Sequence, residues 1–141
     1  MILVVLSTFF LSVPMRVKYL YWGTTSLLAL LMLASGVMYF TAESIAANFE
    51  RLGFPAYFRM ELGLAKIVGA IALLAPLPRA VKEWTYAGFT ISFVSAIVAH
   101  TASGDPLSAL VPPAIALVVL ATSYISYRKY IVDDTAQPDG R

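Results

Sequence analysis

Five ionisable residues are placed where they could do chemistry together: Arg59, Glu61, Lys66, His100 and Asp105. Glu61 and His100 could pass a proton between them, because burial raises the pKa of one group while neighbouring charges tune the other. Lys66 and Arg59 could polarise a carbonyl oxygen. The structural alternative is that Glu61 and Lys66 fix the helix register through buried pairing, while His100 bonds to a backbone carbonyl or to Glu61.

Aromatic residues continue inward from His100 at helical spacing, through Phe93, Phe89 and Tyr86. Such a stripe could line a slot for a flat apolar ligand such as a quinone, with Phe89 and Phe93 stacked on the ring. The alternative is plain core packing. The ligand-binding prediction therefore comprises the five ionisable residues together with Phe89 and Phe93, and Glu61 and His100 are the candidates for catalysis.

Motifs for other chemistry are missing from the chain. There is no Gly-rich phosphate loop, G-x-S-x-G elbow or HExxH motif. With no cysteine and a single histidine, the sequence predicts no metal site and no intrinsic cofactor. A bound quinone is the one cofactor that the pattern leaves open.

Elements that position these residues follow from composition. Hydrophobic residues make up 60% of the 141 residues and charged residues only 13%, against about half and a quarter in soluble domains. Lipid is therefore the expected surrounding. Basic residues occur in pairs separated by long apolar stretches, which excludes nucleic-acid binding.

Four apolar stretches, over residues 22–40, 57–76, 84–103 and 107–127, approach the length of a membrane-spanning helix. The sequence predicts an all-α membrane protein, an antiparallel four-helix transmembrane bundle. A charged residue near a span centre costs about 2.5 to 3.5 kcal/mol. Lys66 therefore needs a partner or water.

Basic residues set the expected orientation. Arg16, Lys18, Arg79, Lys82, Arg128 and Lys129 fall on one side of the four stretches. The positive-inside rule places that side, and both termini, in the cytoplasm. We expect a multi-pass protein of the cell (plasma or inner) membrane, with the five ionisable residues near the outer face.

The chain divides into an N-terminal apolar extension and basic flank (1–18), the transmembrane domain (19–130) and a disordered polar tail (131–141). Residues 1–14 are predicted to lie on the membrane surface, unless Met15 is the native start. Residues 42–52 predict a short amphipathic helix on the outer surface, capped by Thr41 and stopped by Gly53.

Three stretches resemble the DoxX-like family of small four-span membrane proteins: YLYWGTTSLLALLMLASGVMYF, FPAYFRMELGLAKIVGAIALLAP and KEWTYAGFTISFVSAIVAHTASGDP. The likeness covers roughly residues 19–128. Its most specific parts are the E-L-G-x-A-K-I-x-G-A run (Glu61 to Ala70) and the A-G-F…A-H sequence ending at His100. The resemblance implies the bundle but no single activity, since relatives include a thiosulfate:quinone oxidoreductase partner, redox-complex members and assembly chaperones. Residues 1–14 depart from the family pattern.

Three functions remain open from the sequence. The leading hypothesis is an accessory or assembly subunit without catalysis, whose partners are the bilayer and either other membrane proteins or further copies of the chain. The alternatives are a quinone-binding redox or proton-transfer protein, which makes the chain a quinone-linked oxidoreductase subunit, and an oligomeric small-solute transporter.

Overall fold

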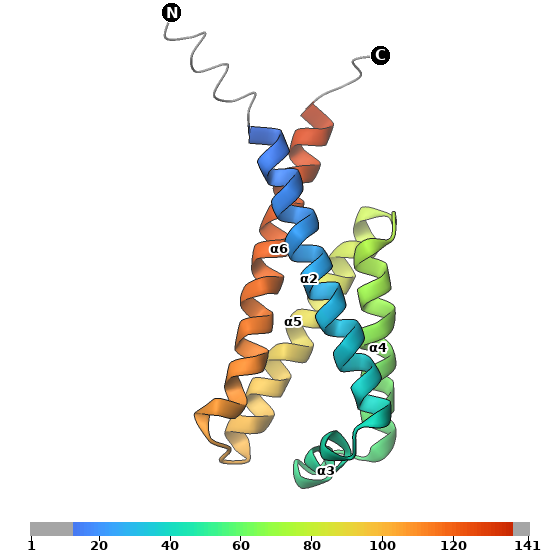
Figure 1. The fold of residues 1–141 in the computed structure, drawn as a ribbon, viewed down its shortest axis with the longest axis vertical. Coiled ribbons are helices and arrows are strands. Elements are labelled where there is room, and N and C mark those ends of the chain that lie inside the picture. Colours follow the sequence, from blue (N-terminus) through green and yellow to red (C-terminus); the bar gives the residue numbers. More distant parts are fainter. Residues whose placement is uncertain (1–12, 137–141) are drawn as a thin grey trace, which may run out of the picture.

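The computed structural model describes residues 13–136. They form five α-helices and one 3-10 turn, in the order α2 (Val13–Thr41), α3 (Glu43–Arg51), α4 (Ala56–Leu74), α5 (Arg79–Ala102), η1 (Leu107–Leu110) and α6 (Val111–Ala136). No strand occurs among these residues, so the all-α prediction is confirmed. Figure 1 shows that the four long helices run alternately up and down.

Helix α2 is the central element, packing along α4 on one flank and α6 on the other. Helix α5 lies behind α2 in Figure 1 and packs mainly against α6. The α2 and α4 backbones approach closely at Gly36 and Gly63, where a Cβ on Gly63 would lie 2.8 Å from the Tyr39 Cβ. Small residues allow this approach, and the van der Waals contact that results stabilises helix association in lipid.

Three helices have the length and apolar composition of membrane spans: Arg16–Thr41, Arg79–Ala102 and Leu107–Val132. The stretch predicted to begin at residue 84 starts earlier, at Arg79. Helix α4 has 19 residues but carries Arg59, Glu61 and Lys66. In the other long helices the Lys, Arg, Asp and Glu residues gather near one end, whereas in α4 these three charges lie within the length of a span.

The loops stop the helices largely as the sequence predicts. Gly53 and Gly104 take positive φ angles of 81° and 69° directly after α3 and α5, a conformation that glycine adopts without strain. Pro112 and Pro113 fall in the first turn of α6, where missing N–H groups cost nothing. They therefore begin that helix and do not interrupt it.

Two predicted boundaries need correction. The N-cap of α3 is Ala42, because the Thr41 hydroxyl donates instead to the Val37 carbonyl at 3.2 Å. Helix α6 continues to Ala136, so residues 131–136 of the predicted polar tail are helical. Residues 137–141 lie outside the described residues.

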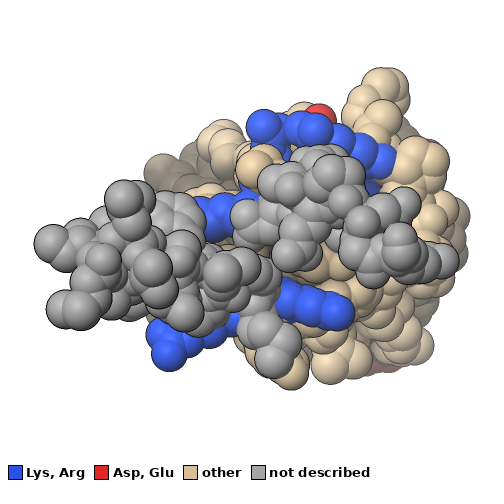
Figure 2. All heavy atoms as spheres, turned by 90° about the horizontal axis from the view of Figure 1, so that it is seen from above, with Lys and Arg blue, Asp and Glu red and all other residues tan. Residues whose placement is uncertain are grey.

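The predicted extension over residues 1–14 also lies outside the described residues, except that Val13 and Pro14 begin α2. Arg16 and Lys18 belong to the same helix. The starts of α2 and α5 and the end of α6 meet at one end of the molecule, as contacts from Lys82 to Tyr21 and from Arg128 to Glu83 demonstrate. Figure 2 views this end, where Lys and Arg side chains gather.

Candidate functional site: polar contacts between the helices

The opposite end of the bundle carries a cluster of three ionisable side chains, which we call the turn cluster: Arg51, His100 and Asp105. Asp105 Oδ2 accepts a hydrogen bond from His100 Nδ1 at 2.6 Å. Arg51 Nη1 donates to Oδ1 of the same carboxylate at 2.6 Å, and Nη2 donates to Oδ2 at 2.8 Å. The sequence predicted the proximity of His100 and Asp105 but missed Arg51.

Two matching helix ends build this cluster. At the end of α5, the Asp105 N–H bonds to the His100 carbonyl at 3.0 Å and the Gly104 N–H to the Thr101 carbonyl at 3.1 Å. This pair of bonds is the Schellman motif. It returns the chain so that Asp105 lies beside His100.

Helix α3 ends in the same motif. The Phe54 N–H bonds to the Phe49 carbonyl and the Gly53 N–H to the Glu50 carbonyl, both at 2.9 Å. The Phe49 and Phe54 rings pack together with their centroids 5.8 Å apart, and this is the apolar contact that accompanies the motif. Arg51, in the last turn of α3, projects from this turn to Asp105.

The turn cluster holds the Asp105 carboxyl in its ionised form to well below neutral pH. Hydrogen bonds from Arg51 and then from His100 lower the pKa of the Asp105 carboxyl to about 2. The same contact raises the pKa of the Arg51 guanidinium. Since an ionised carboxylate only accepts hydrogen bonds, His100 Nδ1 carries a proton. His100 Nε2 forms no hydrogen bond within residues 13–136.

Lys66 lies between α2 and α4 and makes no contact with the turn cluster. Its ammonium group donates to Ser35 Oγ at 2.9 Å and to the Tyr39 hydroxyl at 3.1 Å, and it lies 4.2 Å from the centroid of the Tyr39 ring. Lys66 is 8% exposed. In the described part of the chain it forms no ion pair.

Glu61 does not join either group, contrary to the predicted single cluster. It is exposed, and in the described part of the chain it forms no hydrogen bond or ion pair. Five residues separate it from Lys66, which is about 140° around a helix. Lys66 therefore faces α2 while Glu61 does not. Arg59 also bonds to α2, through the Tyr39 carbonyl.

Phe89 and Phe93 are buried and stack on each other, with ring centroids 6.0 Å apart and planes within 8°. The Phe89 ring fills the space above Gly69, where a Cβ would come within 2.7 Å of the ring tip. Both rings belong to the hydrophobic core. In this structure the two rings pack in the core, which is the alternative to a ligand slot.

Further polar contacts between helices were not predicted from the sequence. Ser123 Oγ lies 2.7 Å from Thr25 Oγ1 and 2.8 Å from the Tyr86 hydroxyl, joining α2, α5 and α6. Lys82 Nζ donates to the Leu73 carbonyl and to the Tyr21 hydroxyl. Ser35 and Tyr39 share a face four residues apart, and that spacing on α2 was the missed signal for Lys66.

Chemically, the described residues offer one oriented imidazole and two buried ammonium groups. A group of three His, Asp or Glu side chains close enough to hold a metal ion is absent from residues 13–136. The His100–Asp105 pair could exchange a proton through Nε2. Lys66 and Lys82 could each donate one more hydrogen bond, because an ammonium group has three donors.

These features define an apolar helical protein with polar links between its helices. The chain belongs to the DoxX-like family, whose sequence profile matches residues 23–123. Family membership and the apolar helices together indicate a membrane protein. Comparisons with curated proteins and with solved structures give no significant match.

Proposed function

We propose that the chain is a four-span accessory or assembly subunit of the cell membrane, with no catalysis of its own. In this proposal α4 is the fourth span, because 19 residues give a helix of about 28 Å, close to the hydrocarbon thickness. Hydrogen bonds to α2 make Arg59 and Lys66 tolerable there. The basic end faces the cytoplasm under the positive-inside rule.

One observation carries the accessory role. Among the described residues, every buried side-chain nitrogen and oxygen has a hydrogen-bond partner. The buried groups contact other helices, as Lys66, Lys82 and Ser123 illustrate. A site that awaits a polar substrate usually leaves some of these groups unpaired. Contacts between helices therefore explain the polar interior, with one donor each of Lys66 and Lys82 left unused.

The apolar flanks supply surfaces for lipid or partner helices. Exposed aliphatic residues continue along α4 at Leu64, Val68 and Ile71, and along α5 at Ile91, Val94 and Val98. In lipid, partner helices gain van der Waals contact with such faces. This fits a subunit that is held by other membrane proteins or by further copies of itself.

The proposal is tested in cells from which the gene has been removed. A photo-crosslinking residue at Ile91, which is 67% exposed, should give an adduct with one defined membrane protein. The same residue at Phe93, which is buried, is the matched control and should give none. Deletion should lower the membrane abundance of that partner, and the unmodified chain should restore it.

Activity of the purified chain would overturn the proposal. The direct measurements are quinol turnover and solute flux in proteoliposomes, each compared with a His100→Ala variant. Turnover or flux that His100→Ala abolishes would establish the redox or the transport function instead. Unchanged abundance of every membrane protein after deletion would also contradict an accessory role.

A quinone-binding redox or proton-transfer role is the second candidate, and Lys66 is the observation that favours it. Its ammonium group is buried and uses two of three donors, on Ser35 and Tyr39. The third could bond to a quinone carbonyl. Lipid extracts of the purified protein would then contain one quinone per chain, and Lys66→Met would remove it.

A further inference from the structure

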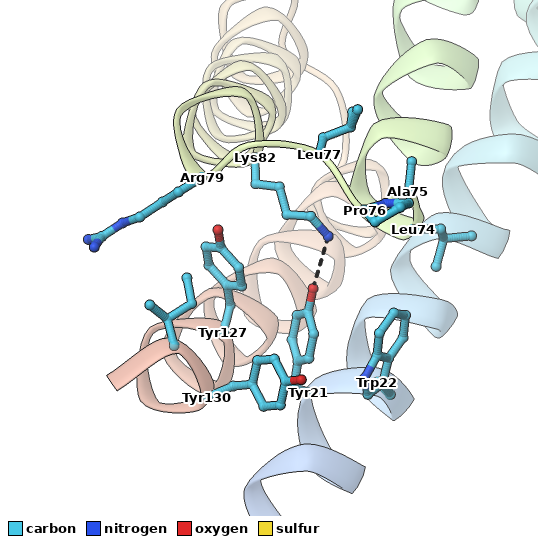
Figure 3. Close-up of a pocket in the computed structure, with 11 residues that line it drawn as sticks. Tyr21, Trp22, Leu74, Ala75, Pro76, Leu77, Arg79, Lys82, Tyr127 and Tyr130 are labelled. Atoms are coloured by element: carbon cyan, nitrogen blue, oxygen red, sulfur yellow. Dashed lines mark hydrogen bonds between the residues drawn. The ribbon is translucent and has the colours of Figure 1, made fainter. Parts of the chain in front are cut away.

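A hollow of about 440 Å³ opens at the basic end of the bundle. The start of α2, the end of α4, the start of α5 and the end of α6 surround it. Figure 3 shows residues that line it, among them Tyr21, Trp22, Arg79, Lys82, Tyr127 and Tyr130. Its volume is within the range of small-ligand sites.

Lys82 is the cation in the wall of this hollow. Its Nζ donates to the Leu73 carbonyl at 2.9 Å and to the Tyr21 hydroxyl at 3.2 Å, which leaves a third donor unused. The residue is 7% exposed and forms no ion pair within residues 13–136. A buried cation in this position favours an anionic partner.

The rim of the hollow adds positive charge. Arg79 Nε bonds to Glu83 at 2.8 Å, and Arg128 shares the same carboxylate at 3.3 Å. The Arg79 guanidinium points away from the hollow in Figure 3 and its side chain is 52% exposed. The helix ends that meet here carry three acidic residues in sequence, Glu83, Asp133 and Asp134, against six basic ones, Arg16, Lys18, Arg79, Lys82, Arg128 and Lys129.

The aromatic lining indicates how deep the hollow lies. Tyr and Trp concentrate where acyl chains meet the headgroups, and three tyrosines and one tryptophan line this hollow. Leu74 and Leu77 supply an apolar side beside them. A ligand there meets a cation, hydroxyl groups and an apolar wall together, which matches a phospholipid and not a free ion.

We propose that this hollow binds the phosphate-bearing headgroup of one anionic phospholipid. The phosphate accepts the third hydrogen bond of Lys82, and Arg79 contacts the headgroup at the rim. Basic sites between helices on the cytoplasmic side bind lipid headgroups in this way. The inference uses the membrane placement of the proposed function but not the accessory role.

The test uses Trp22 as a reporter. The chain has two tryptophans, and the other, Trp84, is 82% exposed and does not line the hollow. In a Trp84→Phe background, Trp22 fluorescence is measured in phosphatidylcholine vesicles containing a small fraction of one brominated lipid. Brominated phosphatidylglycerol should quench with an affinity about fivefold or more above that of brominated phosphatidylcholine, given about 1 kcal/mol per basic residue.

Two variants and one control locate the effect. Lys82→Met and Arg79→Gln should each lower the preference for the anionic lipid about fivefold. Because Lys82 also bonds to the end of α4, its variant could fail to fold, and Arg79→Gln keeps the test decisive. Lys129→Gln removes the same charge from an exposed position at this end, outside the hollow, and should leave the preference unchanged.

Four results would overturn the inference. Equal quenching by the two brominated lipids would exclude selective binding, and an equal loss in Lys129→Gln would indicate general surface attraction. Reversal of quenching by inorganic phosphate, at matched ionic strength, would assign the hollow to a soluble anion. No quenching by either lipid would show that this end of the protein does not lie in the membrane. That result contradicts the membrane placement of the proposed function and differs from the three results that contradict only lipid selectivity.

Discussion

Arg51 donates two hydrogen bonds to the Asp105 carboxylate, from Nη1 at 2.6 Å and from Nη2 at 2.8 Å, and the two residues are 54 positions apart in sequence. Helix α3, which carries Arg51, packs on α2 and α4, whereas Asp105 follows α5. Within residues 13–136 this is the one side-chain hydrogen bond or ion pair that connects α3 with the turn between α5 and η1. It ties the α2–α4 side of the bundle to the α5–α6 side.

The first prediction concerns this tie. Arg51→Gln should let α3 move relative to the α5–η1 turn, because glutamine lacks the charge and the paired donors of arginine. Spin labels on cysteines placed at Ala47 and Ser108, both exposed, should give a broader distance distribution than in the parent. The chain has no cysteine of its own, so labelling is specific. Glu50→Gln, an exposed change on the same helix, should leave the distribution narrow.

The second prediction is a pH dependence of stability. The folded pKa of Asp105, about 2, is below the ordinary carboxyl value of 3.8. Asp105 therefore takes up a proton more readily in the unfolded chain than in the folded one. Its contribution to the free energy of unfolding is complete above about pH 4 and is lost as the pH falls towards 2. The melting-temperature difference between the parent and Asp105→Asn should stay constant from neutral pH down to that point and then shrink. A difference that persists undiminished down to pH 2 would contradict the pairing.

The third prediction tests the approach of α2 and α4. Gly63→Ala places a methyl group 2.8 Å from the Tyr39 Cβ and 2.9 Å from Phe40 Cε2. Overpacking of this kind costs about 1 to 3 kcal/mol, so the melting temperature in detergent should fall. Gly88→Ala is the matched control, with nothing within 4 Å of the new methyl group. Equal melting temperatures for the two variants would show that the helices do not approach at Gly63.

The fourth prediction concerns the partners of Lys66. Tyr39→Phe removes one acceptor from a buried ammonium group and should destabilise the protein by about 1 to 3 kcal/mol. In a Lys66→Met background the same change should cost much less, because no buried charge then remains to be satisfied. A thermal-unfolding double-mutant cycle measures this coupling. Additive effects would mean that Tyr39 does not support Lys66.

Sequence reasoning was most reliable where local chemistry decides the outcome. The apolar runs predicted the long helices, and Gly53 predicted the stop of α3, because glycine permits positive φ. The profile match over residues 23–123 confirmed the DoxX-like resemblance. Closeness in sequence also predicted that His100 and Asp105 lie together, since only the tight turn after α5 separates them.

Prediction was weakest for the hydrogen-bond partners of long charged side chains, because such a side chain can reach more than one neighbouring helix. Glu61, Lys66 and His100 were expected in one cluster near the outer face. Lys66 instead bonds to Ser35 and Tyr39 on α2, and Arg51 takes the place beside Asp105. Depth follows from residue number, but the direction in which a helix face points depends on which helices pack together.

The amino-acid order by itself determined the apolar character, the helical elements and the gathering of basic residues at one end, because each depends on composition and on short-range backbone limits. The tertiary structure decided the pairing of α2 with α4 and of α5 with α6, and with it the partners of each buried charge. Pairing depends on close fits such as Gly36 against Gly63. Those fits arise only when distant segments meet, and spacing along one chain does not specify them.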